Sequence, residues 1–188
     1  LQDQAIGLHR VFFLMDVEGE RDHPGARPLP AVREGLRLEN VSLHYPDGTH
    51  ALQDVSLEAR VGEVTALVGP AGAGKSSLAY LVPRFLHATA GRVLLDGIDV
   101  EELDLDSLRQ QVSFVFQETV LFDDTVEANL RLGRPDASDA DLRRAAAIAG
   151  ADEFIRRLPE GYRTRLGRSG GKLSVGQKQR LSIARALV

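Results

Sequence analysis

A mixed α/β fold is predicted by three patterns in this sequence. The apolar run Val64–Val68 ends at a glycine-rich loop and is followed by a helical pattern from Ser76 to Leu86. Ahead of it, residues 35–45 alternate between apolar and polar, which is typical of antiparallel strands. Behind it, residues 106–188 carry several helical segments. A chain of 188 residues, 43% of them hydrophobic, can bury one sizeable core, so we expect one globular domain.

The N-terminal segment predicts the end of a helix followed by a linker. Apolar residues at helical spacing over roughly the first 16 positions are Ala5, Leu8, Phe12 and Met15. Charged residues, glycine and proline then follow from Glu18 to Pro30, and this composition is typical of a linker.

The remaining elements are expected in chain order. Leu36 and Leu38, then Val41, Leu43 and Tyr45, are the inward-facing residues of a first strand, and Pro46-Asp47-Gly48 supplies a turn. Further on we expect a strand over residues 92–95, a turn at 96–97, a helix over 106–111, a strand over 112–116, and helices over 139–149 and 152–158. Ser174 opens the last helix, with Gln177 at the spacing of a capping box.

Composition excludes several classes of protein. The formal net charge of -4 argues against a nucleic-acid binder held by counterion release. The absence of cysteine removes disulfide frameworks and thiolate metal sites. Apolar stretches such as Val11–Met15 are far shorter than the roughly 20 residues of a membrane helix. A negatively charged ligand would therefore need a local site.

The glycine-rich loop supplies such a site. Its residues, Gly69, Pro70, Ala71, Gly72, Ala73, Gly74, Lys75 and Ser76, match the pattern G-x-x-x-x-G-K-[ST] between a strand and a helix. Glycines let backbone N–H groups approach phosphate oxygens, and the positive end of the helix dipole adds attraction. We expect Lys75 to reach the β- and γ-phosphates of ATP and Ser76 to bind Mg²⁺, and we count Ser77 among the nucleotide-binding residues. The alternative, a chance glycine-rich turn, is disfavoured by the strand and helix on either side.

A second motif narrows the class. Leu173-Ser174-Val175-Gly176-Gln177, together with the helical run that follows, resembles the LSGGQ signature of the ABC ATPases. It forms another anion-binding helix N-terminus, where Ser174 and Gly176 can present hydroxyl and amide donors to a γ-phosphate, with Gln177 beside them. Taken alone, the motif could also be a capped surface helix.

Two further residues fit the same family. Tyr45, before the turn at 46–48, looks like the aromatic residue that stacks on adenine, although it could simply pack. Gln117 looks like the Q-loop glutamine, which in this family touches Mg²⁺ and the attacking water. Its surroundings, Leu108-Arg109, Leu121-Phe122 and then Thr125 to Leu130, are similar to the pattern of exporters.

The resemblance implies a P-loop NTPase core with a parallel sheet, a small antiparallel β-subdomain, and a helical subdomain that carries the signature. It covers residues 33–188, whereas residues 1–32 look like the end of a membrane-domain helix and a linker. The implied parent is a fused half-transporter of the multidrug, lipid or peptide exporter type. Importer ATPases and soluble ABC proteins remain the second choice.

The implied partners are a second ATP-binding domain, paired head to tail, and a transmembrane domain, with no nucleic acid. The implied location is the cytoplasmic face of the cell membrane. ATP and Mg²⁺ are the implied ligands, and the catalytic candidates are Lys75, Gln117 and Ser174.

Two departures from the family pattern leave alternatives open. Val175 replaces the first glycine of the signature pair, and Arg168 stands where exporters usually carry an acidic residue. A degenerate, weakly hydrolytic site in a heterodimeric exporter is therefore an alternative to a fully active one.

We expect that a general base is missing from these residues. The family continues after the signature helix into the Walker B carboxylates, a D-loop and a switch histidine. Here no glutamate follows Glu160, all five histidines precede the signature, and the last helical pattern has no stop signal. The expectation is a fragment, incomplete at its C-terminus, that does not hydrolyse ATP by itself.

Overall fold

A computed structural model describes residues 12, 13, 15, 16, 19, 20 and 22–188. The chain divides into two compact units, Leu1–Val112 and Ser113–Val188. Of the helix predicted at the start, Phe12, Phe13 and Met15 are helical, whereas Ala5 and Leu8 lie outside the described residues.

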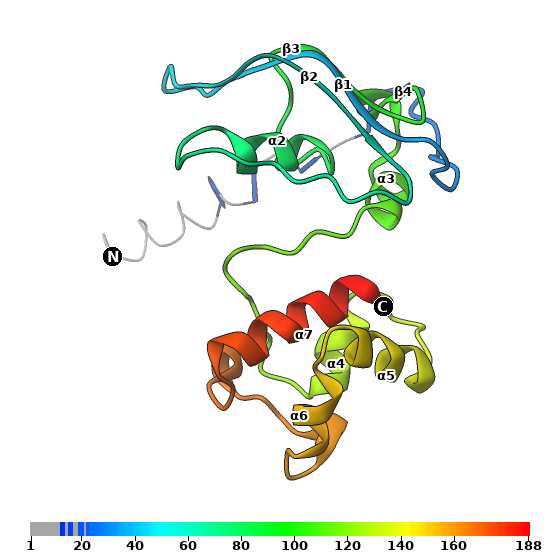
Figure 1. The fold of residues 1–188 in the computed structure, drawn as a ribbon, viewed down its shortest axis with the longest axis vertical. Coiled ribbons are helices and arrows are strands. Elements are labelled where there is room, and N and C mark those ends of the chain that lie inside the picture. Colours follow the sequence, from blue (N-terminus) through cyan, green and yellow to red (C-terminus); the bar gives the residue numbers. More distant parts are fainter. Residues whose placement is uncertain (1–11, 14, 17–18, 21) are drawn as a thin grey trace. The chain divides into compact units, whose positions relative to one another are not determined.

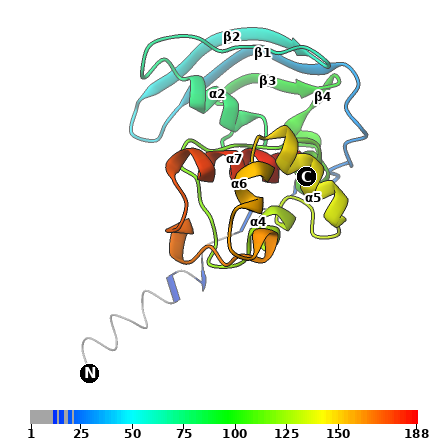
Figure 2. The ribbon, with the colours of Figure 1, turned by 60° about the horizontal axis from the view of Figure 1, so that its bottom comes forward.

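The first unit is a sheet with helices against one face (Figure 1). Its strands are β1 (Gly35–His44), β2 (His50–Arg60), β3 (Ala90–Leu95) and β4 (Ile98–Asp99), and its helices are α2 (Lys75–Leu81), the 3-10 turn η1 (Val100–Glu102) and α3 (Leu105–Gln111). The strand order is β2-β1-β3-β4, and every neighbouring pair is antiparallel (Figure 2). The predicted antiparallel region, with its turn at 46–48, is therefore confirmed.

A bulge in β1 explains the change of phase in its apolar residues. The register with β2 shifts between Leu38 and Val41, and the intervening Asn40 has a φ of 50°. Asn40 Nδ2 donates to a carboxylate oxygen of Asp54 at 2.8 Å, and Asp54 also has a φ of 50°. Asparagine and aspartate tolerate this left-handed conformation better than other side chains. The extra residue keeps both Leu38 and Val41 inside, at exposures of 1% and 0%.

The core of the first unit lies between the sheet and its helices. Its buried members are Leu29, Leu38, Val41, Leu43, Leu52, Leu78, Leu81, Val93, Leu95, Val100, Leu103 and Leu108. Burying one leucine contributes about 1.5–3 kcal/mol, so Leu81 from α2 and Leu108 from α3 fasten these helices to the sheet.

The helix after the glycine loop is shorter than the sequence predicts. We expected it to run from Ser76 to Leu86, but α2 ends at Leu81. Pro83 has no N–H to continue the helical ladder, and Arg84 takes a left-handed φ of 55°. The chain therefore turns there.

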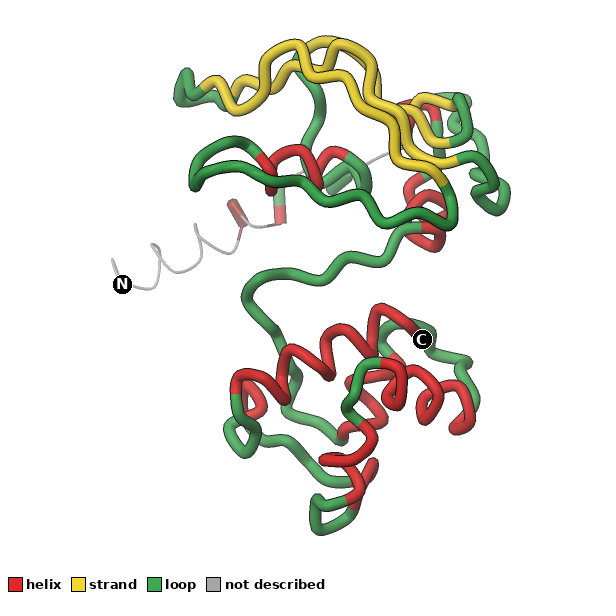
Figure 3. The backbone as a smooth tube through the Cα atoms, viewed as in Figure 1, coloured by secondary structure: helices red, strands yellow, loops and turns green. Residues whose placement is uncertain are grey.

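Two predicted strands do not form. Residues 64–68 and 112–116 are loop segments without strand pairing (Figure 3). Both have the apolar composition of buried strands, yet Val64 and Val68 are 99% and 89% exposed. A strand exists only when a neighbouring strand accepts and donates its backbone hydrogen bonds, and neither segment belongs to a strand ladder of the described residues. The only sheet among the described residues is antiparallel, so the implied parallel sheet is not found among them.

The second unit is helical, which confirms the predicted helical subdomain. It contains α4 (Val126–Arg131), α5 (Asp139–Ile148), α6 (Asp152–Arg156), the 3-10 turns η2 (Gly161–Arg163) and η3 (Arg168–Gly170), and α7 (Val175–Leu187). Helix α4 was not predicted, although Thr125 caps it by accepting a hydrogen bond from Ala128 N at 3.1 Å. Among the described residues, no helix has the length and apolar character needed to cross a membrane.

Candidate nucleotide-binding site

Two glycines of the loop before α2 are required for different reasons. Gly72 and Gly74 have φ values of 81° and 79°, in the left-handed region that favours glycine. A Cβ on Gly72 would meet no atom within 4 Å, so only its backbone conformation matters. A Cβ on Gly74 would lie 2.2 Å from the carbonyl oxygen of Ala51 in β2. The glycine loop can therefore rest directly on the neighbouring strand.

Lys75 folds back over the loop that precedes it. Its Nζ donates to the carbonyl oxygens of Gly69 at 2.9 Å and Pro70 at 2.7 Å. An ammonium group has three donors, so one remains for another acceptor. The cation is thus held at the loop, where a phosphate oxygen would exchange with a carbonyl.

A cavity of about 230 Å³ opens beside the loop. Its lining comprises Tyr45, Thr49, His50, Ala51, Gly72, Ala73, Gly74, Lys75, Ser76 and Ser77. Pockets that enclose a whole small ligand measure roughly 300–1,000 Å³, so this one suits part of a nucleotide. The structure therefore brings Tyr45 together with the C-terminal part of the predicted loop.

The hairpin between β1 and β2 forms the other side of this cavity. The Tyr45 hydroxyl lies 3.0 Å from Ser77 Oγ, which ties the aromatic ring to α2. Thr49 and His50 also line the cavity, and neither was predicted from the sequence. A signal was available, because residues that follow a tight turn pair with those that precede it.

The donor set beside Lys75 suits Mg²⁺. Ser76 lines the cavity with an exposed side chain. Mg²⁺ uses few protein ligands and completes its shell with waters and phosphate oxygens, so one hydroxyl next to a phosphate loop fits it. Within the described part of the chain, no three His, Asp or Glu residues gather into a metal site.

The N-terminus of α7 carries the signature-like motif. Ser174 Oγ accepts from Gln177 N at 3.3 Å, and Gln177 Oε1 accepts from Ser174 N at 2.9 Å, which confirms the predicted capping box. A Cβ on Gly176 would meet no atom within 4 Å, so the fold of this unit does not demand a glycine there. Val175 is 73% exposed at the first position of the helix.

The loop around Gln117 is fixed at its far end by a buried amide. Asn129, 2% exposed, accepts from Phe122 N at 2.8 Å and donates to the carbonyls of Phe122 at 3.1 Å and Thr125 at 2.9 Å. The exporter-like spacing of Thr125 and Asn129 therefore has a structural role. Thr125 caps α4, and Asn129 bonds the backbone polar groups of the turn before it. Gln117 itself is exposed in the loop.

The predicted site residues fall into two sets. Tyr45 and residues 69–77 belong to the first unit, whereas Gln117, Ser174, Gly176 and Gln177 belong to the second. A glycine loop that leads into a helix, with a lysine folded over it and a hydroxyl beside it, defines a P-loop nucleotide-binding protein.

Comparison with known proteins identifies the family. The family model described as ABC transporter matches residues 52–188, and the chain belongs to that family. It is an ATP-binding domain of the exporter type. The chain is 48% identical over 189 residues to an ATP-dependent lipid A-core flippase of Chromobacterium violaceum, covering 100% of this chain and 32% of that protein. It is 42% identical over 189 residues to ATP-binding cassette sub-family B member 6 of Homo sapiens, covering 100% of this chain and 22% of the relative.

A solved exporter structure is similar to this chain in fold and sequence. The bacterial Atm1-family ABC exporter with ATP bound matches 99% of this chain and 33% of its own chain, at 41% identity and a TM-score of 0.89. The chain thus spans about a third or less of the length of these relatives.

Proposed function

We propose that this chain is part of the ATP-binding and ATP-hydrolysing motor domain of an ABC exporter, which as an intact protein drives transport across a membrane. The observation that carries the proposal is the cavity in which Tyr45, Lys75 and Ser76 meet beside the glycine loop. Residues 33–188 form the proposed ATP-binding domain, and residues 1–32 the proposed link from a transmembrane domain at whose cytoplasmic face the domain works.

Each side of the cavity has a proposed role toward ATP. The loop amides and Lys75 hold the β- and γ-phosphates, and Tyr45 stacks on the adenine ring. Ser76 and Gln117 are the proposed Mg²⁺ ligands, and Mg²⁺ held there would supply neutralisation of the phosphate charge.

The signature motif is proposed to act on a second copy of the domain. Two domains pair head to tail, and Ser174, Gly176 and Gln177 of one face the γ-phosphate held by the P-loop of the other. The open space over Gly176 supports this, because a glycine in a helix is unfavourable unless something must approach it closely.

A non-hydrolysing role is the second candidate. Val175 places a 73% exposed branched side chain where a γ-phosphate would dock. We infer in addition that residues 1–188 alone do not turn over ATP, because no glutamate follows Glu160 to act as general base after the signature.

The test of the proposal is Lys75→Ala in the full-length protein. Losing a hydrogen bond to a charged group costs about 1.5–3 kcal/mol, so the affinity for ATP should fall about 10- to 150-fold by calorimetry. Arg60→Ala is the matched control, because this cation of the same unit is paired with Glu58 at 2.9 Å on β2 and does not line the cavity. Equal affinities of wild type and Lys75→Ala would refute the P-loop assignment.

A further inference from the structure

The segment before β1 is bound to the first unit by hydrogen bonds of its backbone and side chains. We name Glu20 and residues 22–29 the N-terminal strap. Its backbone forms a parallel bridge between Arg27 and Leu103, with Arg27 N donating to Glu102 O at 3.0 Å and Asp104 N donating to Arg27 O at 2.9 Å. At its end Leu29 is buried in the core at 6% exposure. The strap is therefore bound to the backbone beside η1 and to the core of the unit.

The strap also completes the N-terminus of α3. The Asp22 carboxylate accepts a hydrogen bond from Leu105 N at 2.8 Å, beside the cap provided by Asp104. Ser107 Oγ accepts from Leu29 N at 2.8 Å. Helix ends leave backbone donors without partners, so the strap supplies part of what this helix needs to begin.

Arg109 joins the strap to the end of the P-loop helix. Its guanidinium donates to both carboxylate oxygens of Glu20, at 2.6 and 2.9 Å. It also donates from Nε to Pro83 O at 3.1 Å and from a terminal nitrogen to Arg84 O at 3.3 Å, and it lies 5.2 Å from the centre of the Phe85 ring. The hydrogen bond and charge of Arg109 hold the pKa of Glu20 below its ordinary value.

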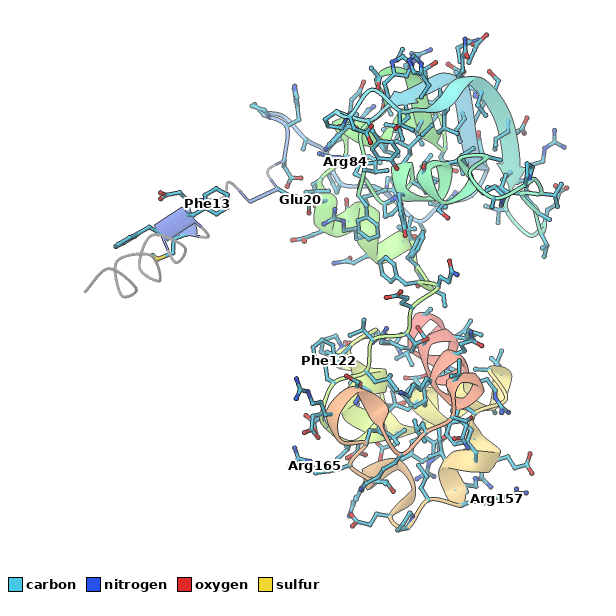
Figure 4. All side chains as sticks on the ribbon, turned by 90° about the vertical axis from the view of Figure 1, so that its left-hand side faces the viewer. Phe13, Glu20, Arg84, Phe122, Arg157 and Arg165 are labelled. Atoms are coloured by element: carbon cyan, nitrogen blue, oxygen red, sulfur yellow. The ribbon has the colours of Figure 1, made fainter. Side chains whose placement is uncertain are left out.

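A second arginine reinforces the same junction. Arg84, 5% exposed, donates to Leu103 O at 2.7 Å and to Val100 O at 3.3 Å. Figure 4 shows Arg84 and Glu20 in the same part of the unit. The turn after α2 folds back onto that helix, since Phe85 N donates to the carbonyl oxygen of Tyr80 in α2 at 2.9 Å. Carbonyls of η1 therefore accept hydrogen bonds both from the turn that follows α2 and from the strap.

We propose that Arg109 is a positioning residue that couples the N-terminal strap to ATP binding at the P-loop. In the strap, Glu20 forms an ion pair with Arg109. Arg109 also donates hydrogen bonds to two carbonyls of the turn that follows α2, the helix that begins with Lys75. The same residue belongs to α3, whose last residue, Gln111, precedes the loop that contains Gln117. A segment arriving from a membrane domain would thereby set the P-loop helix and receive its state in return. This inference rests on the proposed function.

Reciprocity makes the coupling measurable. If the docked strap favours ATP binding, ATP must favour the docked strap by the same factor. Two readouts on the full-length protein follow, namely the affinity for Mg²⁺–ATP and the hydrogen exchange of peptides spanning residues 22–29 and 102–109. These peptides contain the amides of Arg27, Leu29 and Leu105 that bond across the strap.

The informative variant is Glu20→Gln, with Glu58→Gln as its matched control. Glu58 makes an exposed pair with Arg60 at 2.9 Å in the same unit, away from the strap. We expect Glu20→Gln to weaken Mg²⁺–ATP binding by up to about fivefold, which is the most that a partly exposed ion pair contributes. We also expect ATP to slow exchange of the strap peptides in the wild type and no longer to do so in this variant. Glu58→Gln should match the wild type in both readouts.

Arg109→Lys separates positioning from charge. Lysine keeps the charge but loses the planar fork that reaches the carboxylate and the carbonyls together, so it should behave like Glu20→Gln. Faster strap exchange in Glu20→Gln with unchanged ATP affinity, and no effect of ATP on the strap of the wild type, would overturn the coupling and leave a purely structural ion pair. Failure of the wild type to bind ATP at all would overturn the proposed function instead.

Discussion

At the scale of single residues, the site is held by contacts that a nucleotide would either use or replace. Tyr45 is tied to Ser77 by a 3.0 Å hydrogen bond, and the Lys75 ammonium rests on two loop carbonyls. Each contact places a side chain before any ligand arrives, which lowers the ordering cost of binding.

Tyr45 variants separate stacking from this tether. Stacking of a base on an aromatic ring is worth about 1–3 kcal/mol, so Tyr45→Ala should weaken ATP and GTP binding alike, by about 5- to 150-fold in calorimetry. Tyr45→Phe keeps the ring and loses only the hydrogen bond to Ser77. This loss should lower the free energy of unfolding by about 0.5–1.5 kcal/mol. A loss confined to one of the two bases would contradict the stacking role.

Asp96 predicts a dependence of stability on pH. Its carboxylate accepts from the backbone N–H groups of Arg33, Glu34 and Gly35 at 2.6, 2.9 and 2.9 Å. Burial raises the pKa of Asp96, but these donors lower it by more, so it lies below the ordinary value of 3.8. Because the folded state holds the ionised form, the stabilisation is complete above pH 3.8 and is lost as the pH falls through the lower folded pKa.

Asp96→Asn tests this contribution. Asparagine tolerates the left-handed φ of 49° at this position but offers a single neutral acceptor oxygen, so we expect a loss of about 1–3 kcal/mol at pH 7. Thermal unfolding between pH 7 and pH 2 should show a smaller acid-induced decrease for the variant than for wild type. Asp136→Asn, at a side chain that is 88% exposed, is the control, and equal slopes in all three proteins would contradict the assignment.

At the scale of elements, the start of α7 sets stability against function. Glycine inside a helix costs roughly 0.5–1 kcal/mol relative to alanine, and the Cβ of an alanine at Gly176 would meet only open space. Gly176→Ala should therefore raise the midpoint of thermal unfolding while lowering the ATPase rate of the full-length protein, because the Cβ stands where the partner's γ-phosphate would dock.

Val175→Gly is the opposite change and should raise that ATPase rate. Phosphate release and thermal unfolding of both variants are the measurements. A decrease in both stability and rate in Gly176→Ala would show that the glycine serves the fold of the unit, contrary to the open space around it.

At the scale of the whole molecule, two apolar segments form no strand in the part of the chain that the structure describes. Residues 64–68 and 112–116 have the composition of buried strands but do not belong to the sheet of the described residues, and exposed apolar segments of this kind favour association. The first of them leads directly into the P-loop, so its order affects the site.

Purified residues 1–188 should consequently show at most weak binding and no turnover. Removing a positioned general base from an enzyme lowers its rate by about 10²–10⁴. The measurement is Mg²⁺-dependent phosphate release by residues 1–188, compared with that of the full-length protein. Similar rates for both chains, abolished by Lys75→Ala, would show that a carboxylate such as Glu118 or Asp123 serves as the base.

The sequence by itself determined the features that depend on neighbours along the chain. The hairpin turn, the capping box of Ser174 and Gln177, the glycine loop and most helices follow from local spacing and are found where predicted. Local hydrogen bonds and capping need only residues a few positions apart, which is why they are legible in the sequence.

Tertiary structure decided what depends on distant partners. The need for glycine at 74 comes from the carbonyl of Ala51, and the bulge at Asn40 is bonded to Asp54 across the hairpin. In the sequence Arg109 is only part of an exporter-like pattern, and its contact with Glu20, 89 positions away, exists only in the folded chain. The segments 64–68 and 112–116 show the converse, because apolar composition makes a strand possible, whereas only a paired neighbour, which the sequence pattern cannot supply, makes it form.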